Sequence, residues 1–568
     1  MAKKVPDVKL EPATKGMQSN LSHYSASPNS WSFLENFDTD RQGVLRTRPN
    51  VYIKGVSLTT NDFQGAGAMQ SIDSNGLPYE RFLVKSGTEC YNIQANDASY
   101  GNLTANSITF ANAGDIARFD TIQGLGVFAC NGNNVRFTSN GTSATDFATA
   151  GLGMPTTTDI ISCGFSGRIW GATGNTAPST FIQDRVYYSD VIPASGVANT
   201  TGSGQYIRVN TKGKFITGLV EANNVLYVFT ADSVFRIYNT QSVDNTPFIN
   251  IGAVRQEAIV KTFDSIYFYH FTGVYKLDGA GATKVSQDID DFIGKMAILT
   301  EAFGATGGSD DASYLKRVFG WFDEQSVYFS VDWDPGFAGA ATDKDRTYIV
   351  RFNYLFKTWS VYSLKDFRLS WAVSNFFPSD YGGLTIAASM APITLLLGKN
   401  ITSDIYLAGY YDIPPYYDGE KNSLGSGENF LGEPLGDWSF FGDVTYTPST
   451  TSNAIRPIYS NGETQWLDFG LENHIKEING ISIASENGQG FQLMYQIDNE
   501  QEQKSDRRNP VWYEIGTLGE KYVTHFLDFK SKPFFRIKFK VSGQTLGRPV
   551  EIGNITMISV SDEGYGKN

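Results

Sequence analysis

The feature that most constrains this chain is a set of short, alternating apolar runs that occur in pairs joined by a few polar residues. Residues 224–230 and 234–238 are one pair, and residues 265–270 and 274–277 are another. Alternation with a period of two places every second side chain on one face of a strand, so each pair predicts a β-hairpin. The further pairs are 81–85 with 90–93, 126–130 with 135–137, 168–170 with 184–190, 326–330 with 347–352, and 405–408 with 416–417.

The spacing of these pairs predicts how the strands are arranged. They recur roughly every 40 to 60 residues, which is typical of β-propeller blades that bury their faces by stacking radially. The 57 glycines and the 14% aromatic content agree with many strands and tight turns. We therefore predict an all-β fold with a β-propeller of six or seven blades over residues 31–440. A large sandwich or a string of unrelated hairpins is the alternative.

The two ends of the chain differ from this pattern. Residues 1–30 are polar and contain three prolines, which predicts an extended N-terminal arm. Residues 418–445 are rich in glycine and charge and are interpreted as a linker or exposed loop. Six or seven alternating runs follow between residues 465 and 558. They predict a separate C-terminal β-sandwich of jelly-roll or immunoglobulin-like size, over residues 441–568.

Cysteine content, hydropathy and charge bound the environment of the protein. Cys90, Cys130 and Cys163 are too few for a disulfide framework and are expected to be buried small hydrophobes, folded in a reducing cytoplasm. Residues 1–7 have no apolar stretch behind them, so no secretory signal is expected, and no run approaches the roughly 20 apolar residues of a membrane span. The net charge of −13 argues against binding to nucleic-acid phosphates.

Residues with catalytic or metal-binding chemistry lack the spacing that such chemistry needs. The four histidines are His23, His270, His474 and His525. None lies at metal-ligand spacing from another histidine or a cysteine, and His270 is expected to be a core or interface ring. Asp323 and Asp332 could form a glycosidase pair, but among 59 acidic residues such a pairing is expected by number alone. We predict no enzymatic activity and no catalytic, cofactor-binding or metal-binding residues.

Two segments have weaker indications of binding. Residues 332–336, followed by Asp343 and Asp345, carry carboxylates but lack the ordered spacing and closing glutamate of a calcium loop. A solvated insertion between strands is the favoured interpretation. Residues 410–417 contain four tyrosines and two prolines, and exposed tyrosines there could stack on sugars. A proline-stiffened turn packed by its own tyrosines is the favoured alternative.

Several short motifs resemble one known family. Residues 34–36 and then 43–50 resemble the Asn…Gly-x-Leu-x-x-Arg-Pro-Gly opening of tail nozzle and packaged-DNA stabilisation (tail hub) proteins of short-tailed bacteriophages. Asn50 stands where that family usually has glycine, and both residue types tolerate positive φ. Later stretches that resemble the family are residues 185–190, 215–238 and 251–275. The resemblance covers roughly residues 31 to 295 and extends to the rest of the chain only in character.

This resemblance implies a structural virion protein of the phage tail, folded in the host cytoplasm. The chain would form a homo-oligomeric ring of six copies at the distal end of the tail, where it lines the DNA channel and retains or gates packaged DNA. Its implied partners are portal or adaptor tail proteins, tail fibres or a needle, and DNA that passes without sequence-specific binding. An acidic channel wall would keep the DNA from adhering.

Two other classes of protein remain as alternatives. One is a receptor- or glycan-binding tail fibre or tailspike component, although the short periodic rungs of a β-helix are not seen in the sequence. The other is a secreted or surface-bound propeller that binds ligands, which the lack of a signal peptide and of disulfides disfavours.

Overall fold

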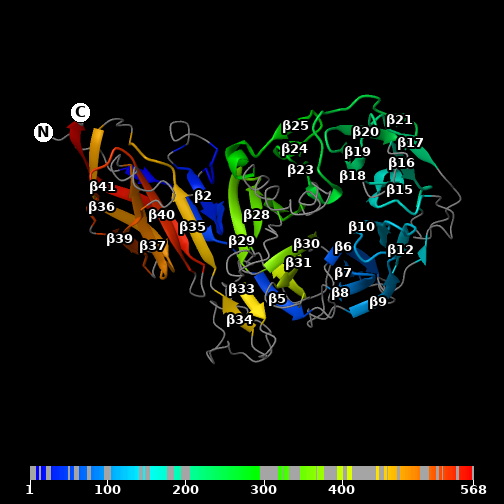
Figure 1. The fold of residues 1–568 in the computed structure, drawn as a ribbon, viewed down its shortest axis with the longest axis horizontal. Coiled ribbons are helices and arrows are strands. Elements are labelled where there is room, and N and C mark those ends of the chain that lie inside the picture. The colour runs from blue at the N-terminus through cyan, green and yellow to red at the C-terminus, as the bar shows by residue number, and fades with distance from the viewer. Residues whose placement is uncertain are drawn as a thin grey trace, which may run out of the picture.

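The computed structural model is built almost entirely of β-strands joined by turns and loops, which confirms the predicted all-β fold (Figure 1). Its described helical segments are three 3-10 turns and one helical turn at residues 290–293. The structure describes residues 8–11, 15–20, 27, 29–41, 43–48, 51–56, 63–72, 78–94, 104–139, 145–146, 154–174, 184–192, 205–293, 318–323, 325–331, 346–365, 367–375, 393–400, 406–411, 443–446, 453–456, 458–469, 474–498, 511–519, 523–527, 529–544 and 549–565.

Five four-stranded antiparallel sheets and two four-stranded antiparallel segments of one 13-stranded sheet form seven units in the described chain. Unit 1 contains β6 (Phe63–Ile72), β7 (Pro78–Ser86), β8 (Glu89–Gln94) and β9 (Thr104–Thr109). Units 2 and 3 contain β10 (Ala117–Ile122), β11 (Leu125–Cys130), β12 (Arg136–Thr138) and β13 (Thr145–Asp146), and then β14 (Ile160–Cys163), β15 (Ile169–Ala172), β16 (Arg185–Tyr188) and β17 (Tyr206–Arg208).

The other four units continue the same up-and-down order. Units 4 and 5 contain β18 (Ile216–Ala222), β19 (Val225–Thr230), β20 (Val234–Asn239) and β21 (Ser242–Val243), and then β22 (Ile259–Lys261), β23 (Ile266–His270), β24 (Gly273–Leu277) and β25 (Ala282–Lys284). Units 6 and 7 contain β26 (Phe319–Phe322), β27 (Ser326–Val331), β28 (Arg346–Asn353) and β29 (Thr358–Lys365), and then β30 (Phe367–Asn375), β31 (Ile393–Asn400), β32 (Tyr406–Tyr411) and β5 (Val51–Val56).

The first strands of these units form a closed circle. Each of β6, β10, β14, β18, β22, β26 and β30 lies against the first strand of the next unit, and β30 lies against β6. The outermost strand of unit 7 is β5, which precedes unit 1 in the chain and pairs antiparallel with β32. This arrangement is a β-propeller closed by a strand from the other end of the ring (Figure 1).

Glycine residues in β6, the first strand of unit 1, allow it to lie close to β10, the first strand of unit 2. A Cβ atom at Gly65 in β6 would lie 2.0 Å from the carbonyl oxygen of Ala117 in β10. One at Gly67 would lie 2.2 Å from the Cβ atom of Phe119. Because no side chain can occupy that space, any larger residue at either position would push units 1 and 2 apart.

The second domain is a sandwich of two sheets. One sheet has the order β3 (Phe37–Arg41), β4 (Val44–Thr47), β41 (Glu551–Tyr565), β36 (His474–Glu486) and β39 (Val523–Leu527), with β1 (Val8–Leu10) also paired to β41. The other has the order β38 (Tyr513–Thr517), β37 (Phe491–Ile497), β40 (Ile537–Gln544), β35 (Tyr459–Thr464) and β2 (Trp31–Glu35). Side chains of both sheets share one core, in which the rings of Phe37 and Phe491 are 6.2 Å apart.

The sandwich uses strands from both ends of the chain, which differs from the predicted domain bounds. Residues 31–47, expected in the propeller over 31–440, form β2, β3 and β4 of the sandwich. Within the expected arm of residues 1–30, β1 pairs with β41. The reason is physical: a strand's own pattern shows which face is buried but not which distant strand completes its sheet. Residues 443–446 and 453–456 form a separate hairpin, β33 (Asp443–Tyr446) with β34 (Asn453–Arg456), beside β5.

The propeller and the sandwich are joined rather than loosely tethered. Strand β2 of the sandwich pairs in parallel with β29, the outer edge of unit 6, through Glu35 and Val361. Next to this pair, the Met17 N–H donates to the carbonyl oxygen of Trp359 at 2.9 Å. One hydrophobic cluster contains residues of both domains, among them Trp31, Trp359 and Phe491. The edge of unit 6 is therefore covered, which protects it from pairing with other chains.

Three sequence predictions about single residues and segments are addressed by the structure. Cys90, Cys130 and Cys163 are buried free thiols, as expected. His270 is also buried, next to the rings of Phe271 and Tyr275. In the described part of the chain, no helix has the length and apolar character required to cross a membrane.

Candidate functional site

Four charged side chains meet at the axis of the propeller. Arg118 of β10 donates from Nε to Glu257 Oε1 at 2.7 Å and from Nη1 to Asp159 Oδ2 at 3.2 Å. Arg255 donates from Nε to the other oxygen of Glu257. Arg118 belongs to unit 2, whereas Glu257 immediately precedes the first strand of unit 5. Because units 3 and 4 separate them along the circle, this ion pair spans the axis and obstructs it.

The carboxylates and guanidinium groups of this axial cluster keep one another in their charged forms. Burial alone would raise the pKa of Glu257, but Arg118 and Arg255 outweigh it and lower that pKa to about 2. Burial disfavours the charged form of Arg118 as well, yet Glu257 and Asp159 raise its pKa. The side chain of Glu257 is 4% exposed. A carboxylate held ionised by two guanidinium groups is unsuited to acid–base catalysis near neutral pH, so the cluster is a structural plug.

A second layer of charge lies farther along the same strands. Lys261 of β22 donates to Glu221 of β18 at 2.7 Å, and Asp120 of β10 accepts from the Cys163 N–H at 2.7 Å. Burial raises the pKa of Asp120 to about 6, although hydrogen bonds from the backbone of Cys163 and Thr121 and the charge of Lys261 oppose this. Asp120 therefore ionises in the range where the pH of biological compartments varies.

Asp120 makes the stability of the propeller depend on pH with a definite sign. Its folded pKa of about 6 lies above the ordinary value of 3.8, so the folded state holds the proton more tightly. The stabilisation is present below pH 3.8 and is lost as pH rises through about 6, at a cost on the order of 2–3 kcal/mol. We expect Asp120→Asn to gain stability relative to wild type between pH 4.5 and pH 7 in urea unfolding experiments. Parallel curves for the two proteins across this range would contradict the assignment.

The motif residues Asn36 and Arg48 form a buried node between the two domains. Arg48, which is 1% exposed, donates from Nε to Asn36 Oδ1 at 2.8 Å and from Nη2 to the Ser363 carbonyl at 3.2 Å. The Asn36 amide nitrogen donates to the Tyr459 carbonyl at 2.7 Å and to the Ser363 hydroxyl at 3.0 Å. Ser363 lies in β29 of the propeller and Tyr459 in β35 of the sandwich. A single asparagine therefore binds both domains.

The backbone at this node also requires particular residue types. Asn36 has φ 58°, between β2 and β3, a conformation that asparagine tolerates better than most other non-glycine residues. Gly43, in the turn between β3 and β4, has φ 83°. The asparagine and the first glycine of the motif thus both occupy positions with positive φ, and the node itself comes from the asparagine and the arginine.

A second set of buried polar groups links β3 of the sandwich to unit 6 of the propeller. Asp38 accepts from the Tyr362 hydroxyl and lies 3.4 Å from Arg351 Nη1. Arg351 Nε donates to the Tyr328 hydroxyl at 3.3 Å, and that hydroxyl donates to Asp323 Oδ2 at 2.5 Å. Buried polar groups bonded to one another in this way favour one arrangement of the packed elements.

Asp323, the sequence candidate for a glycosidase pair, has a structural role in the described residues. One of its oxygens accepts from the backbone N–H groups of Gln325 at 2.8 Å and Ser326 at 2.7 Å, closing the turn between β26 and β27. Burial raises its pKa, and the residue is 6% exposed. Its proposed partner Asp332 lies outside the described residues, as do Asp343, Asp345 and residues 412–417. The described chain brings no three His, Cys, Asp or Glu residues together as a metal site.

Sequence reasoning missed the axial cluster, although a signal was present. Arg118 and Asp120 are two residues apart in a strand, as are Arg255 and Glu257 just before another strand. Charges at i and i+2 lie on the same face of a strand. The rule applies to Arg118 and Asp120 in β10, whereas Arg255 and Glu257 lie at the 3-10 turn before β22, so the cluster can be located only once the propeller is known.

Comparisons with known proteins give distant structural likenesses alone. No family model matches the sequence, and no curated protein sequence matches it. One similar solved structure is BBS1N in complex with ARL6DN, at 10% identity and a TM-score of 0.27, covering 61% of this chain and 79% of that one. Another is the exo-β-1,3-galactanase of Phanerochaete chrysosporium, at 9% identity and 0.25, covering 89% and 99%. The AfRom2 CNH domain has 7% identity and 0.34, covering 64% and 100%. Likenesses this distant do not assign a function.

Proposed function

We propose that the chain is a non-enzymatic tail nozzle or packaged-DNA stabilisation protein of a short-tailed bacteriophage. It assembles as a ring of six copies at the distal end of the tail, between portal or adaptor proteins and the fibres or needle. It folds in the host cytoplasm and becomes part of the virion. The ring lines the channel and retains or gates the packaged DNA.

The observation that carries this proposal is the role of the family-like motif. Asn36 and Arg48 are the polar residues through which β29 of the propeller and β35 of the sandwich are held together. A channel wall must resist pressure without its domains moving apart, and a buried, mutually satisfied polar node supplies that stiffness. The motif that prompted the resemblance therefore has a mechanical reason to be present.

The axial cluster constrains where DNA would pass. Because Arg118 and Glu257 obstruct the propeller axis, DNA in this proposal runs between neighbouring copies and not through one propeller. A sixfold ring needs side-to-side contacts of two different surfaces that close on themselves. The net charge of −13 per chain then favours a lumen from which phosphates are repelled, so that DNA slides.

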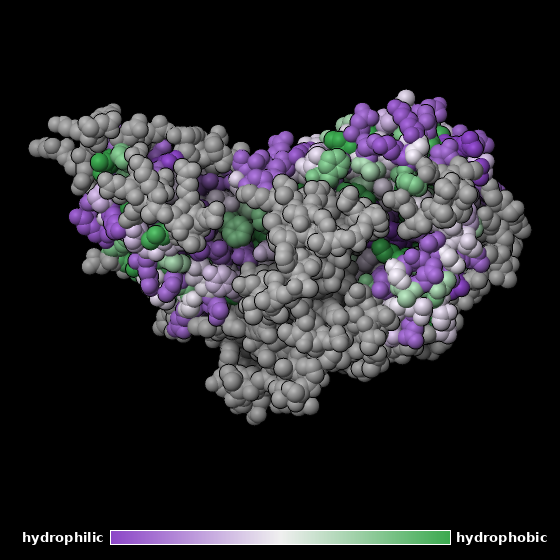
Figure 2. Space-filling model, in the orientation of Figure 1, coloured by the Kyte–Doolittle hydropathy of each residue, from purple (hydrophilic) through white to green (hydrophobic). Residues whose placement is uncertain are grey.

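The surface view is compatible with a polar exterior. Figure 2 shows hydrophilic residues gathered over the outer rim of the propeller near β20 and β21, with small apolar spots between them. Such a surface does not favour non-specific association.

Counting copies in the particle tests the proposal directly. Calibrated mass spectrometry of purified virions should give half as many copies of this chain as of a twelve-subunit portal protein. Cryo-electron microscopy of the same particles should place acidic residues on the lumen. Absence from the particle, or a count in multiples of three well above six, would refute the nozzle assignment, and a basic lumen would refute the sliding argument.

A further inference from the structure

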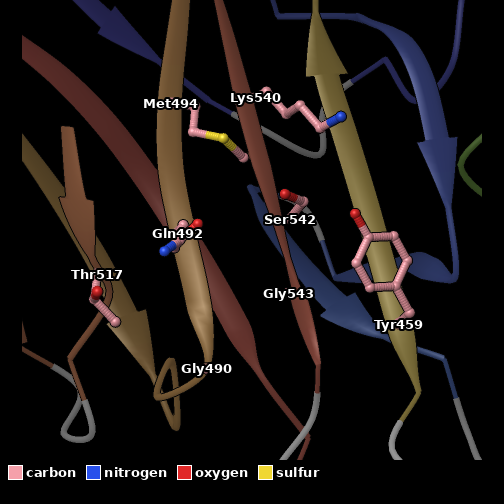
Figure 3. A pocket seen from close by; sticks show the side chains of 8 residues that line it. All are labelled: Tyr459, Gly490, Gln492, Met494, Thr517, Lys540, Ser542 and Gly543. Atoms are coloured by element: carbon pink, nitrogen blue, oxygen red, sulfur yellow. The ribbon is translucent and has the colours of Figure 1, made fainter. Parts of the chain in front are cut away.

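A groove of about 520 Å³ crosses the outer face of the sandwich sheet that contains β38, β37, β40 and β35 (Figure 3). It is lined by Tyr459, Gly490, Gln492, Met494, Thr517, Lys540, Ser542 and Gly543. Residues that alternate with these along the strands, such as Phe491, Leu493 and Val541, point into the core. The groove thus lies on the face of the sheet that the sandwich core does not use.

Glycines shape one end of the groove. Gly490, with φ 85°, lies just before β37, and Gly543 lies opposite Phe491 in β40. A Cβ atom at Gly543 would lie 2.2 Å from the carbonyl oxygen of Gly490. Glycine is required there because the two segments approach so closely, and the lack of side chains at both positions leaves the end of the groove open.

The groove combines one exposed aromatic ring with neutral polar groups. Tyr459 is 44% exposed, and its ring is seen face-on in Figure 3. The strand register places Thr517, Gln492, Ser542 and Asn461 side by side across four strands. Hydroxyl and amide groups of this kind both donate and accept hydrogen bonds.

One groove hydroxyl and one amide oxygen in the neighbouring strand have no hydrogen-bond partner among the described residues. Ser542 is 7% exposed and lines the groove, yet its hydroxyl makes no hydrogen bond with any described residue. Asn461 Oδ1, in the neighbouring strand, is buried and has no partner in the described structure. Because Ser542 lines the groove, its hydroxyl can both donate to and accept from a polar group of a ligand placed there.

The charges near the groove are held by protein partners, and one of them bonds to a groove residue: Gln492 Nε2 donates to Glu514 Oε1 at 3.3 Å. Glu463 lies 3.5 Å from Lys540 and 2.8 Å from Lys538, and Lys540 also lies over the ring of Trp512. A phosphate or carboxylate ligand would have to compete with Glu463 for both lysines. The arrangement therefore favours a neutral ligand.

We propose that this groove binds a neutral oligosaccharide. The Tyr459 ring stacks on the apolar face of one sugar, and Gln492, Thr517 and Ser542 bond to hydroxyl groups of its neighbours. Strands lie ~4.8 Å apart, so four strands accommodate about three sugar units placed across them. A few polar groups around an apolar surface fix a ligand's orientation.

A peptide strand is a poorer fit to the same surface. An added strand pairs through the backbone at the edge of a sheet, whereas this groove lies on its face. An amphipathic helix would need a continuous apolar surface, and the lining includes one tyrosine and one methionine as its large apolar residues. Sugar binding here is independent of ring assembly, and either can fail alone.

Affinity electrophoresis of the full chain tests this inference. Native gels are cast with neutral dextran, mannan or galactan, and with acidic alginate. We expect retardation in at least one neutral gel, a roughly tenfold weaker retardation constant for Tyr459→Ala, and weaker retardation for Gln492→Ala. Tyr238→Ala, which removes a tyrosine that is 39% exposed on the propeller, is the matched control and should bind like wild type.

Each other outcome would overturn the proposal. These outcomes are retardation by alginate alone, no retardation by any of the four polysaccharides, and equal retardation of wild type and Tyr459→Ala. Circular dichroism of each variant confirms that it is folded. The copy number in virions, measured separately, reports on the nozzle proposal without reference to sugar binding.

Discussion

Replacing Glu257 with glutamine is expected to destabilise the propeller by about 3–5 kcal/mol, because the change leaves two buried guanidinium groups without their shared counter-ion. Glu257 bonds to Arg118 across the axis and to Arg255 beside it. Since the pKa of Glu257 is lowered to about 2, its contribution is present above pH 4.5 and is lost as pH falls through about 2. Chemical unfolding at pH 7, followed by intrinsic fluorescence, measures the change.

A matched substitution separates this effect from a general loss of charge. Glu221→Gln removes a carboxylate from a pair whose Lys261 side chain is 48% exposed. An exposed pair contributes at most about 1 kcal/mol, so this variant should unfold close to wild type. A double-mutant cycle of Glu257→Gln with Arg118→Met should show strong coupling. Equal losses in Glu257→Gln and Glu221→Gln would show that the axis is hydrated and that the plug does not exist.

Arg48→Lys is expected to loosen the junction between the domains, at a cost of about 2–4 kcal/mol. Lysine keeps the charge but not the planar fork, so it cannot donate to Asn36 Oδ1 and the Ser363 carbonyl in the same geometry. Hydrogen exchange read by mass spectrometry should rise in β29 and β35, which Asn36 joins. Exchange in units 2 to 4 of the propeller should not change.

The control for this experiment is an exposed arginine. Arg208→Lys in β17 alters a side chain on the propeller surface, and its exchange pattern should match that of wild type. If Arg48→Lys also matches wild type, the node does not hold the domains together. The mechanical support for the nozzle proposal would then be lost, although the fold would remain.

Local pattern was enough to predict most hairpins but not their partners. The sequence predicts that residues 224–230 pair with residues 234–238, and β19 and β20 do so, because alternation and a short turn are local properties. First strands such as β6 and β10 were harder to predict. They carry glycine or charge where they meet at the axis, so Gly65, Arg118 and Asp120 interrupt the apolar pattern.

The node of Asn36 and Arg48 shows why contacts between the two domains could not be predicted from local sequence. Asn36 and Arg48 were singled out by resemblance, yet nothing local shows that they would contact Ser363 and Tyr459, more than 300 residues away in the chain. For Asp323, the residue type suggested a function that the structure does not support. It had the chemistry of a catalytic carboxylate, and only its burial and its bonds to Ser326 and Tyr328 show that it closes a turn. Burial is set by the whole fold and not by neighbours in sequence.

The closure of both domains by early strands has a consequence for synthesis. Strand β5 pairs with β32, β2 pairs with β35, and β4 pairs with β41. Each of these early strands is therefore synthesised long before the strand that it pairs with. Pairings of such long sequence separation are slow to form. A ribosome-bound or truncated chain would present open sheet edges, which invite aggregation. Fusing or cutting this protein between its two visible lobes would therefore yield two incomplete pieces, and a chaperone-rich host or a permuted chain would favour its production.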